Sequence, residues 1–193
     1  MKTIVVASNN KHKIKEIKEI LTGYNVLTLN DIGFHDEIIE DGKTFEENAL
    51  IKARTIHNYL KSKNLNHIVL ADDSGLCVDA LNGAPGVYSA RYAKEHSDDQ
   101  ANRDKLLKEL EGKDRTANFV CNIVLYYPNG EYKTFAGKTE GKITKEEIGN
   151  KSFGYDCIFY SNELNKTFGE AKDEEKNVVS HRGRALKEML KKL

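Results

Sequence analysis

The sequence predicts an α/β protein built on a mixed β-sheet. Short β-type runs alternate with helical runs in the first half of the chain, a hairpin signal lies in the middle, and a helical pattern ends it. The chain has 193 residues, and a chain of this size buries roughly 70% of its unfolded surface. Apolar residues make up 39% and charged residues 31%, which is typical of a globular protein. We expect residues 1–193 to form a single domain of two lobes.

The first half of the chain contains two expected strand–helix pairs. A β-type run at 3–7 precedes a helical pattern at 14–21, where apolar residues recur at a period near 3.6. A weak strand at 25–29 follows, and residues 31–43 are acidic and irregular. The letters TFEE then match a capping box, in which a threonine and a glutamate satisfy each other's backbone amides. This box opens a helix that we expect over 44–62.

The middle of the chain predicts strands separated by an acidic turn. A third strand is expected at 67–71, and it ends in Asp72, Asp73, Ser74 and Gly75. Because aspartate, serine and glycine favour turns, the pattern indicates a turn here and a further short strand at 76–78.

The second half of the chain predicts a helix, a hairpin and a final helix. Ser97 begins a second capping-box pattern, SDDQ, ahead of a leucine-bearing helix that reaches residue 110. Runs at 119–127 and 131–135 flank Pro-Asn-Gly, a hairpin signal, and the antiparallel stretch continues to Ile143. Ser180 caps the last helix, whose inward positions are Ala185, Leu186, Met189, Leu190 and Leu193.

Charge and cysteine content limit the classes of protein. Thirty basic residues balance thirty acidic ones, so no overall field favours nucleic acid or an anionic membrane. The chain shows no apolar run long enough for a secretory signal or a spanning helix. Cys77, Cys121 and Cys157 lack CxxC spacing, which argues against a disulfide framework and against a zinc site. We expect a cytoplasmic protein with free thiols and with no nucleic-acid or membrane partner.

A polar turn between the first strand and the first helix is a candidate phosphate site. It reads SNNKHK and comprises Ser8, Asn9, Asn10, Lys11, His12 and Lys13. The free amides and the positive dipole end of a helix attract anions, and the two lysines add charge. The turn is not a Walker A loop. The alternative interpretation is an asparagine N-cap with solvated lysines.

The adjacent acids Asp72 and Asp73 are a candidate metal site. Neighbouring strand residues point to opposite faces, so we expect only one of the two to enter the site. Carboxylates suit Mg²⁺, which is typically held by one or two of them together with substrate oxygens and water. A second acid is available from the run Glu37, Glu40 and Asp41. The alternative is an aspartate that caps a turn.

The sequence FGYD and three later cations are candidates for base recognition. Phe153, Gly154, Tyr155 and Asp156 combine an aromatic face, a flexible glycine and a carboxylate. A base stacked on Phe153 gains about 1–3 kcal/mol, and Asp156 is able to accept its N–H groups. Donors to phosphate or to a base carbonyl are available in Lys176, His181 and Arg182. The alternatives are core aromatics around a tight turn and a solvated basic helix end.

Five segments in this order resemble the Ham1/inosine-triphosphatase family of non-canonical purine nucleoside triphosphate pyrophosphatases. They are ASNNKHKIKE (7–16), DGKTFEENALIKA (41–53), ADDSGLCVDALNGAPGVYSARYA (71–93), FGYDCIF (153–159) and EEKNVVSHRGRALK (174–187). The third is long and specific, and the resemblance covers nearly the whole chain. It implies an elongated mixed sheet with helical lobes flanking a central nucleotide-binding cleft, and a homodimer.

The resemblance also implies an activity and a role for each matching residue. The activity is Mg²⁺-dependent hydrolysis of ITP, dITP and XTP to the monophosphate and pyrophosphate, which cleanses the nucleotide pool. Residues 8–13 then match the triphosphate-binding segment and Ser74 a substrate contact, while Asp73 matches the general base and metal ligand. The base-recognition set matches Phe153, Gly154, Tyr155, Asp156, Lys176, His181 and Arg182.

Three positions depart from the family's usual pattern. His12 stands where glycine is common, and Cys157 stands where proline commonly follows FGYD. Before Gly42 the chain reads Ile39-Glu40-Asp41 instead of two acids and a polar residue. We take Glu40 as the second metal ligand.

Two other functions fit parts of the sequence. A Maf-like pyrophosphatase would act on pyrimidine or methylated nucleotides, whereas the FGYD and SHRG segments favour purines. A catalytically silent nucleotide sensor would not need Asp73 beside a complete phosphate segment. Among purines, donors such as Lys176 and Arg182 suit the C6 carbonyl of hypoxanthine or xanthine, and adenine would leave them unpaired.

Overall fold

Within the residues that the computed structural model describes, 1–94 and 96–193, a mixed seven-stranded sheet has the order β2-β1-β3-β4-β5-β6-β7. The strands are β1 (Thr3–Val6), β2 (Asn25–Leu27), β3 (Ile68–Val78), β4 (Thr116–Tyr126), β5 (Tyr132–Ile143), β6 (Phe159–Ser161) and β7 (Lys166–Thr167). β1 pairs in parallel with β2 and β3, whereas β6 pairs antiparallel with β5 and β7. The expected α/β class with a mixed sheet is confirmed.

The helices lie between and after these strands. The α-helices are α1 (Lys11–Ile20), α2 (Phe45–Ser62), α3 (Asp99–Glu109), α4 (Asp173–Val179) and α5 (His181–Leu190). Short 3-10 helices occur at η1 (Asp79–Leu81), η2 (Gly86–Arg91) and η3 (Asp156–Ile158). No helix among the described residues is both long enough and apolar enough to cross a membrane.

The chain divides into two compact units. Unit 1 comprises Met1–Asp73, Cys121–Ala136 and Ala185–Leu193, and unit 2 comprises Ser74–Val120 and Gly137–Arg184. The single domain of two lobes therefore remains a prediction, and each unit is described by itself.

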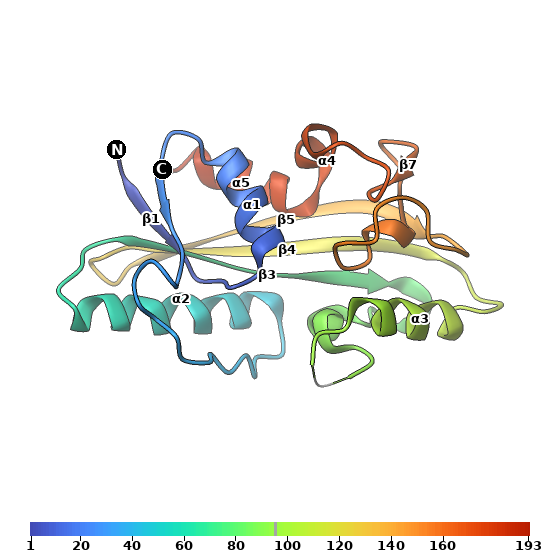
Figure 1. Cartoon of the computed structure of the whole chain (residues 1–193), viewed down its shortest axis with the longest axis horizontal. Helices are drawn as coiled ribbons and strands as arrows, with labels where there is room; N and C mark the ends of the chain where they lie inside the picture. The colour runs from blue at the N-terminus through green and yellow to red at the C-terminus, as the bar shows by residue number, and fades with distance from the viewer. Residues whose placement is uncertain (95) are drawn as a thin grey trace. The chain divides into compact units, whose positions relative to one another are not determined.

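In unit 1 the strands bury residues on both faces. One face of β1 and β3 packs against the inward side of α2, which carries Ala49, Ala53, Ile56 and Leu60. The other face packs against α1 and the end of α5, through Ile17, Leu21, Ala185, Leu186 and Met189. Figure 1 shows α1 and α2 on opposite sides of these strands. Successive residues of β3 therefore face different helices.

In unit 2 a separate core is rich in phenylalanine. Strand residues of β3, β4 and β6 meet the inward side of α3 and the segment after η3, in a cluster that includes Leu76, Leu106, Leu110, Phe119, Phe159 and Phe168. Phe119 lies 4.5 Å from Phe159 between ring centroids and 5.9 Å from Phe168. Figure 1 shows α3 on one side of the unit 2 strands and α4 on the other.

The helix starts agree largely with the capping signals. The Thr44 hydroxyl accepts from the Glu47 amide at 3.1 Å, as a capping box requires. The reciprocal bond is displaced by one residue, because the Glu47 carboxylate accepts from the amide of Lys43. Ser180 caps α5 as expected, since its hydroxyl accepts from the Gly183 amide at 2.9 Å.

Two expectations about elements were wrong, and one helix was not predicted. The acids do not form a turn between two strands, because β3 continues through them from Ile68 to Val78. Pairing with strands on both sides outweighs the turn preference of aspartate and glycine. The cap of α3 is Asp98 rather than Ser97, since the Asp98 carboxylate accepts from the Ala101 amide. The short helix α4 was not expected at all.

Candidate active site

The polar turn of unit 1 has the structure of a capped helix start. The Asn10 side chain accepts from the amides of His12 and Lys13, at 3.0 and 3.1 Å. The amide of Asn10 donates to the Ser8 hydroxyl at 3.1 Å. Lys11 and His12 are exposed, whereas Lys13 turns inward. The N-cap interpretation therefore describes Asn10, and the idea of solvated lysines fails for Lys13.

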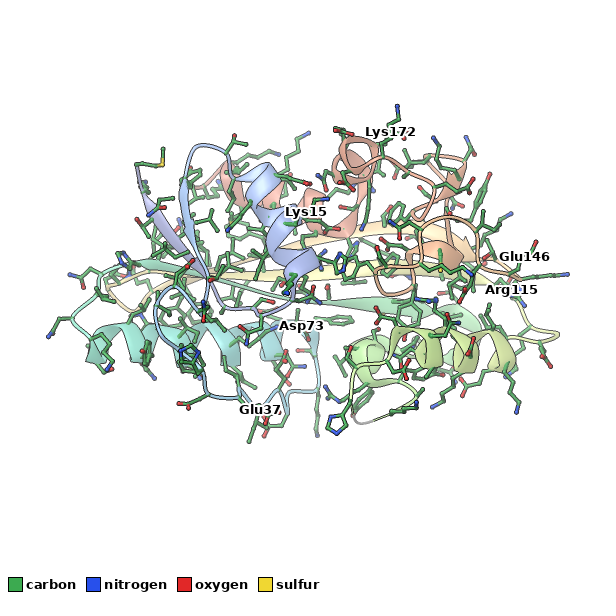
Figure 2. All side chains as sticks on the ribbon, in the orientation of Figure 1. Lys15, Glu37, Asp73, Arg115, Glu146 and Lys172 are labelled. Atoms are coloured by element: carbon green, nitrogen blue, oxygen red, sulfur yellow. The ribbon has the colours of Figure 1, made fainter. Side chains whose placement is uncertain are left out.

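The two adjacent acids of β3 lie in different surroundings. Asp72 is buried, with one carboxylate oxygen 3.4 Å from Lys13 Nζ and 3.9 Å from the Cys121 thiol. Asp73 lies on the α2 side of β3 (Figure 2). Its Oδ2 atom is buried and finds no hydrogen-bond partner in the part of the chain that the structure describes. Strand alternation thus presents one carboxylate to α1 and the other to α2.

The Asp73 carboxyl group is held in a state that resists ionisation. Its pKa is raised from 3.8 to about 6, chiefly because burial disfavours the charged form. Lys52 and Lys13 oppose this rise in pKa, while the like charges of Glu40 and Asp72 add to it. A carboxyl group with this pKa and an oxygen without a hydrogen-bond partner is able to bind a cation or to accept a proton.

Lys52 is a member of this cluster that the sequence analysis missed. It lies on the inward face of α2 with 8% of its surface exposed. Its ammonium group lies 3.0 Å from Glu40 Oε1 and donates to the Asp72 carbonyl. Burial lowers the pKa of Lys52, but the carboxylates of Asp72, Glu40 and Asp73 outweigh burial and raise it. Lys52 therefore carries a positive charge beside three acids.

Glu40 reaches Lys52 because the start of α2 holds the acidic segment. The amide of Gly42 donates to the side chain of the buried Asn48 at 2.8 Å. A Cβ atom at position 42 would lie 2.7 Å from that same Asn48 oxygen, so the approach requires glycine. The hydrogen bond to Asn48 fixes the backbone at Gly42, and Glu40 stands two residues before it.

The residues Lys13, Glu40, Lys52, Asp72 and Asp73 form what we call the acidic cluster. Three carboxylates face two ammonium groups in it, so one negative charge is in excess. Within the described residues, no three His, Cys, Asp or Glu side chains form a ready-made metal site. Mg²⁺ commonly takes only one or two protein carboxylates and completes its shell with substrate and water. The excess charge and the unsatisfied Asp73 oxygen fit such an ion.

The FGYD segment of unit 2 is built around a buried ion pair. Lys176 Nζ lies 2.7 Å from Asp156 Oδ2, and the two residues are 6% and 8% exposed. The same ammonium group lies 4.9 Å from the ring centroid of Phe153 and 5.7 Å from that of Phe168. The phenol of Tyr155 donates to the carbonyl of Ser89 at 2.6 Å. Phe153 and Asp156 are thus brought together through Lys176.

His181 and Arg182 of unit 2 are also buried. The His181 ring stacks on Phe119 with centroids 4.7 Å apart and planes 12° apart. Arg182 is 1% exposed, and its Nη2 donates to the Ser74 hydroxyl at 2.9 Å. The alternative of a solvated basic helix end is wrong for all three cations, because Lys176, His181 and Arg182 are buried.

The predicted residues therefore fall into two groups. In unit 1 the structure brings Lys13, Glu40 and Asp73 into one ionic cluster, and it leaves Asn9, Lys11 and His12 at the surface. In unit 2 it joins Phe153 and Asp156 through Lys176, and Ser74 to Arg182. Their roles toward a nucleotide remain predictions.

An α/β fold with a mixed sheet carries a lysine-lined carboxylate cluster in unit 1 and buried aromatic and basic groups in unit 2. The model of the Ham1 family matches residues 4–192. The chain therefore belongs to the Ham1 family.

Curated relatives and solved structures agree with that membership. The chain is 52% identical to a dITP/XTP pyrophosphatase of Clostridium perfringens, covering 98% of this chain and 96% of the relative. It is 49% identical to a dITP/XTP pyrophosphatase of Bacillus subtilis, covering 100% and 98%. The Staphylococcus aureus Ham1 protein matches with a TM-score of 0.84 and 44% identity, over 97% of this chain and 96% of that one. A HAM1 protein from Coxiella burnetii matches with a TM-score of 0.85 and 39% identity over the whole of both chains.

Proposed function

We propose that this protein hydrolyses the non-canonical purine nucleoside triphosphates ITP, dITP and XTP to the monophosphate and pyrophosphate. The observation that carries the proposal is Asp73, a buried carboxyl group with a raised pKa and an oxygen that has no hydrogen-bond partner among the described residues. Such a group is matched to a water molecule that must lose a proton near neutral pH. Similarity to dITP/XTP pyrophosphatases over nearly the whole chain supports the substrate class.

The phosphate-binding groups belong to unit 1. Residues 8–13 supply the start of α1, hydroxyl and amide side chains, and the inward Lys13. Lys52 adds a second ammonium group, which its neighbours keep charged. These positive charges would stabilise a triphosphate and the negative charge that develops on the departing pyrophosphate.

Asp73 and Glu40 would hold a divalent cation, which we propose to be Mg²⁺. When bound, the ion supplies charge neutralisation on the phosphate oxygens. In the reaction, Asp73 accepts a proton from the attacking water, whose oxygen bonds to the α-phosphorus. The bond between that phosphorus and the bridging oxygen breaks, and pyrophosphate leaves with the electron pair.

Base recognition belongs to unit 2. Phe153 offers a ring face, and the donors Lys176, His181 and Arg182 are buried. Lys176 lies near the rings of Phe153 and Phe168, and His181 stacks on Phe119. Buried donors reject a base that cannot accept from them, because their hydrogen bonds would then be lost. Adenine, with an amino group at C6, is such a base, whereas hypoxanthine and xanthine have a carbonyl there.

Assembly and location follow from the resemblance. We infer a homodimer in the cytoplasm, with residues 1–193 forming one domain of two lobes around a nucleotide-binding cleft. Size-exclusion chromatography with light scattering measures the number of subunits directly.

The test of the proposed function is pyrophosphate release from a panel of nucleotides. ITP, dITP, XTP, ATP, GTP and CTP are each incubated with Mg²⁺ and, separately, with EDTA. We expect metal-dependent release largely confined to ITP, dITP and XTP. Release from CTP would favour the Maf-like alternative. Tight binding of ITP without release would favour a sensor and refute hydrolysis.

A further inference from the structure

A buried arginine of α3 holds the loop that carries Phe153 and Asp156. Arg103 is only 2% exposed. Its Nη1 donates to the carbonyl of Gly154 at 2.7 Å, and its Nε donates to Glu147 Oε1 at 2.8 Å. Its Nη2 donates to the side chain of Gln100 at 3.1 Å. The guanidinium therefore bonds in three directions at once, which suits the planar fork of arginine and not the ammonium of lysine.

Asp99, on the same helix, holds the other side of the same loop residue. Its Oδ2 accepts from the amide of Gly154 at 3.0 Å. Both backbone polar groups of Gly154 are thus bonded to side chains of α3. Gly154 has a φ of +52°, in the left-handed region, and no atom lies within 4 Å of the place where a Cβ would stand. Glycine is required here by the backbone conformation and not by lack of space.

The arginine is also held by Glu147, which has further partners of its own. Glu147 receives hydrogen bonds from Arg103 and from Gln100 Nε2, at 2.8 and 2.7 Å, and pairs with Lys151 at 3.1 Å. These donors, Arg103 first, hold the pKa of Glu147 at about 2. Because Glu147 has these additional partners, removal of Arg103 would not leave a buried carboxylate alone. A variant at position 103 is therefore a test of the loop contact.

The position of Gly154 affects both of its functional neighbours. Phe153 precedes it, and Asp156 follows two residues later; both contact Lys176, at 4.9 Å from the ring centroid and 2.7 Å from Oδ2. Tyr155 is anchored to the Ser89 carbonyl. A shift of the Gly154 peptide would therefore change the spacing between the ring and the carboxylate.

We propose that Arg103 and Asp99 are positioning residues that fix the loop 153–156 and thereby set the discrimination between bases. They act through the Gly154 peptide, not by contact with the nucleotide. The inference rests on the proposed function for its selectivity readout, and it has a structural readout that does not depend on any activity.

The first test compares the kcat/KM ratio for ITP over ATP in the wild type, Arg103→Met, Asp99→Ala and Asp99→Asn. Since a misplacement of about 1 Å can change rates by about 10²-fold, we expect the ratio to fall at least about 10-fold in the first two variants. The rise in KM for ITP should exceed the fall in kcat. Asp99→Asn retains an oxygen that accepts from Gly154, so it should keep the wild-type ratio.

Arg115→Met is the matched control. Arg115 belongs to the same unit and donates through Nη1 to the carbonyl of Thr144 at 2.8 Å, so it loses the same kind of bond at a different place (Figure 2). If Arg103 and Asp99 only stabilised the fold, their loss would lower the fraction of active protein. That would reduce kcat for both substrates and leave the kcat/KM ratio for ITP over ATP unchanged. An unchanged ratio in Arg103→Met and Asp99→Ala, or an equal fall in Arg115→Met, overturns the inference. If Arg103→Met does not fold, Asp99→Ala decides, since Asp99 is only partly buried.

The second test measures hydrogen exchange of the Gly154 amide by NMR, without nucleotide. This amide donates directly to Asp99, so its exchange in Asp99→Ala should be at least about 10-fold faster than in the wild type. An unchanged rate refutes the positioning role. A wild-type protein that releases no pyrophosphate from ITP would instead refute the proposed function, and the exchange rate would still decide whether α3 holds the loop.

Discussion

The carboxyl groups of the two units are held in opposite ways. In unit 1, Asp73 belongs to a cluster of three carboxylates and two ammonium groups, and burial is the main cause that raises its pKa to about 6. In unit 2, Asp156 pairs with Lys176 at 2.7 Å. Glu147 accepts from Arg103, and its pKa is lowered to about 2. The carboxylates around Asp73 in unit 1 thus outnumber their cations, whereas Asp156 and Glu147 in unit 2 are each paired with a cation.

This difference corresponds to the two kinds of chemistry that a nucleotide triphosphate demands. A metal ion and a triphosphate are both charged. Protein side chains whose own charges do not cancel before binding therefore attract them more strongly. A purine base is neutral and is recognised by its shape and its hydrogen bonds. Side chains that are fixed before binding therefore discriminate better between bases. Substitutions of the acids in each unit test this contrast.

The largest effect should come from removing the acid of unit 1. We expect Asp73→Asn to lower kcat for ITP by about 10³-fold, because an amide can neither accept a proton from water nor ligate a metal well. Asp156→Asn, its counterpart in unit 2, should instead raise KM and narrow the preference for ITP over ATP. Steady-state kinetics with Mg²⁺ measure both. Near-normal turnover in Asp73→Asn would remove the basis of the contrast.

The second effect concerns stability in acid. The pKa of Glu147 is about 2 in the folded protein against a reference of 4.5, so its stabilisation is present above pH 4.5 and is lost as the pH falls toward 2. We expect Glu147→Gln to unfold more easily than the wild type by about 2 kcal/mol at pH 7, with the difference shrinking below pH 4. Urea titrations at several pH values measure it.

The neighbouring Glu146 provides a matched control for that experiment. It is exposed, and it stands one residue before Glu147 in the same loop (Figure 2). Glu146→Gln should leave the free energy of unfolding within about 0.5 kcal/mol of the wild type, as surface substitutions usually do. An equal loss of unfolding free energy in both variants would mean that the Arg103–Glu147 pair does not stabilise the fold more than an exposed glutamate does.

Local signals predicted most of the helices and strands. Apolar periodicity and the side chains of Thr44 and Ser180 gave α1, α2 and α5 close to their observed bounds. The residue types of Asp72 and Asp73 favour a turn, and only the pairing of β3 with the strands on both sides overrides that preference. The helix α4, with sequence DEEKNVV, is too short and too charged to show a period.

Long-range contacts explain what the sequence could not predict about the candidate site. Lys52 is a single lysine among the apolar positions of α2, and in the sequence this is only a weak indication of a site residue. Its role becomes visible through its contacts with Glu40 and Asp72, which are distant in the chain. The contact of Arg103 with Gly154 spans 51 residues. Periodicity and caps report on neighbours along the chain, and they carry no information on such pairs.

The smallest effect should be a gain in the free energy of unfolding from Asp73→Asn, the substitution that should lower kcat most. The folded protein raises the pKa of Asp73 from 3.8 to about 6, so the protonated form is favoured by folding. The stability contributed by that group is full below pH 3.8 and is lost as the pH rises through 6. With EDTA present, Asp73→Asn should therefore be more stable than the wild type by about 1 kcal/mol at pH 7.5, and equal to it near pH 4.

Urea unfolding at both pH values, with Asp36→Asn as an exposed control in the same unit, measures this gain. Added Mg²⁺ should then stabilise the wild type more than Asp73→Asn, because an ion that binds only the folded state shifts the equilibrium toward it. A wild type that is more stable than Asp73→Asn at pH 7.5 in EDTA would show that Asp73 is already satisfied by its own neighbours. The contrast between the two units would then be lost, since both would hold their acids fully paired before any ligand binds.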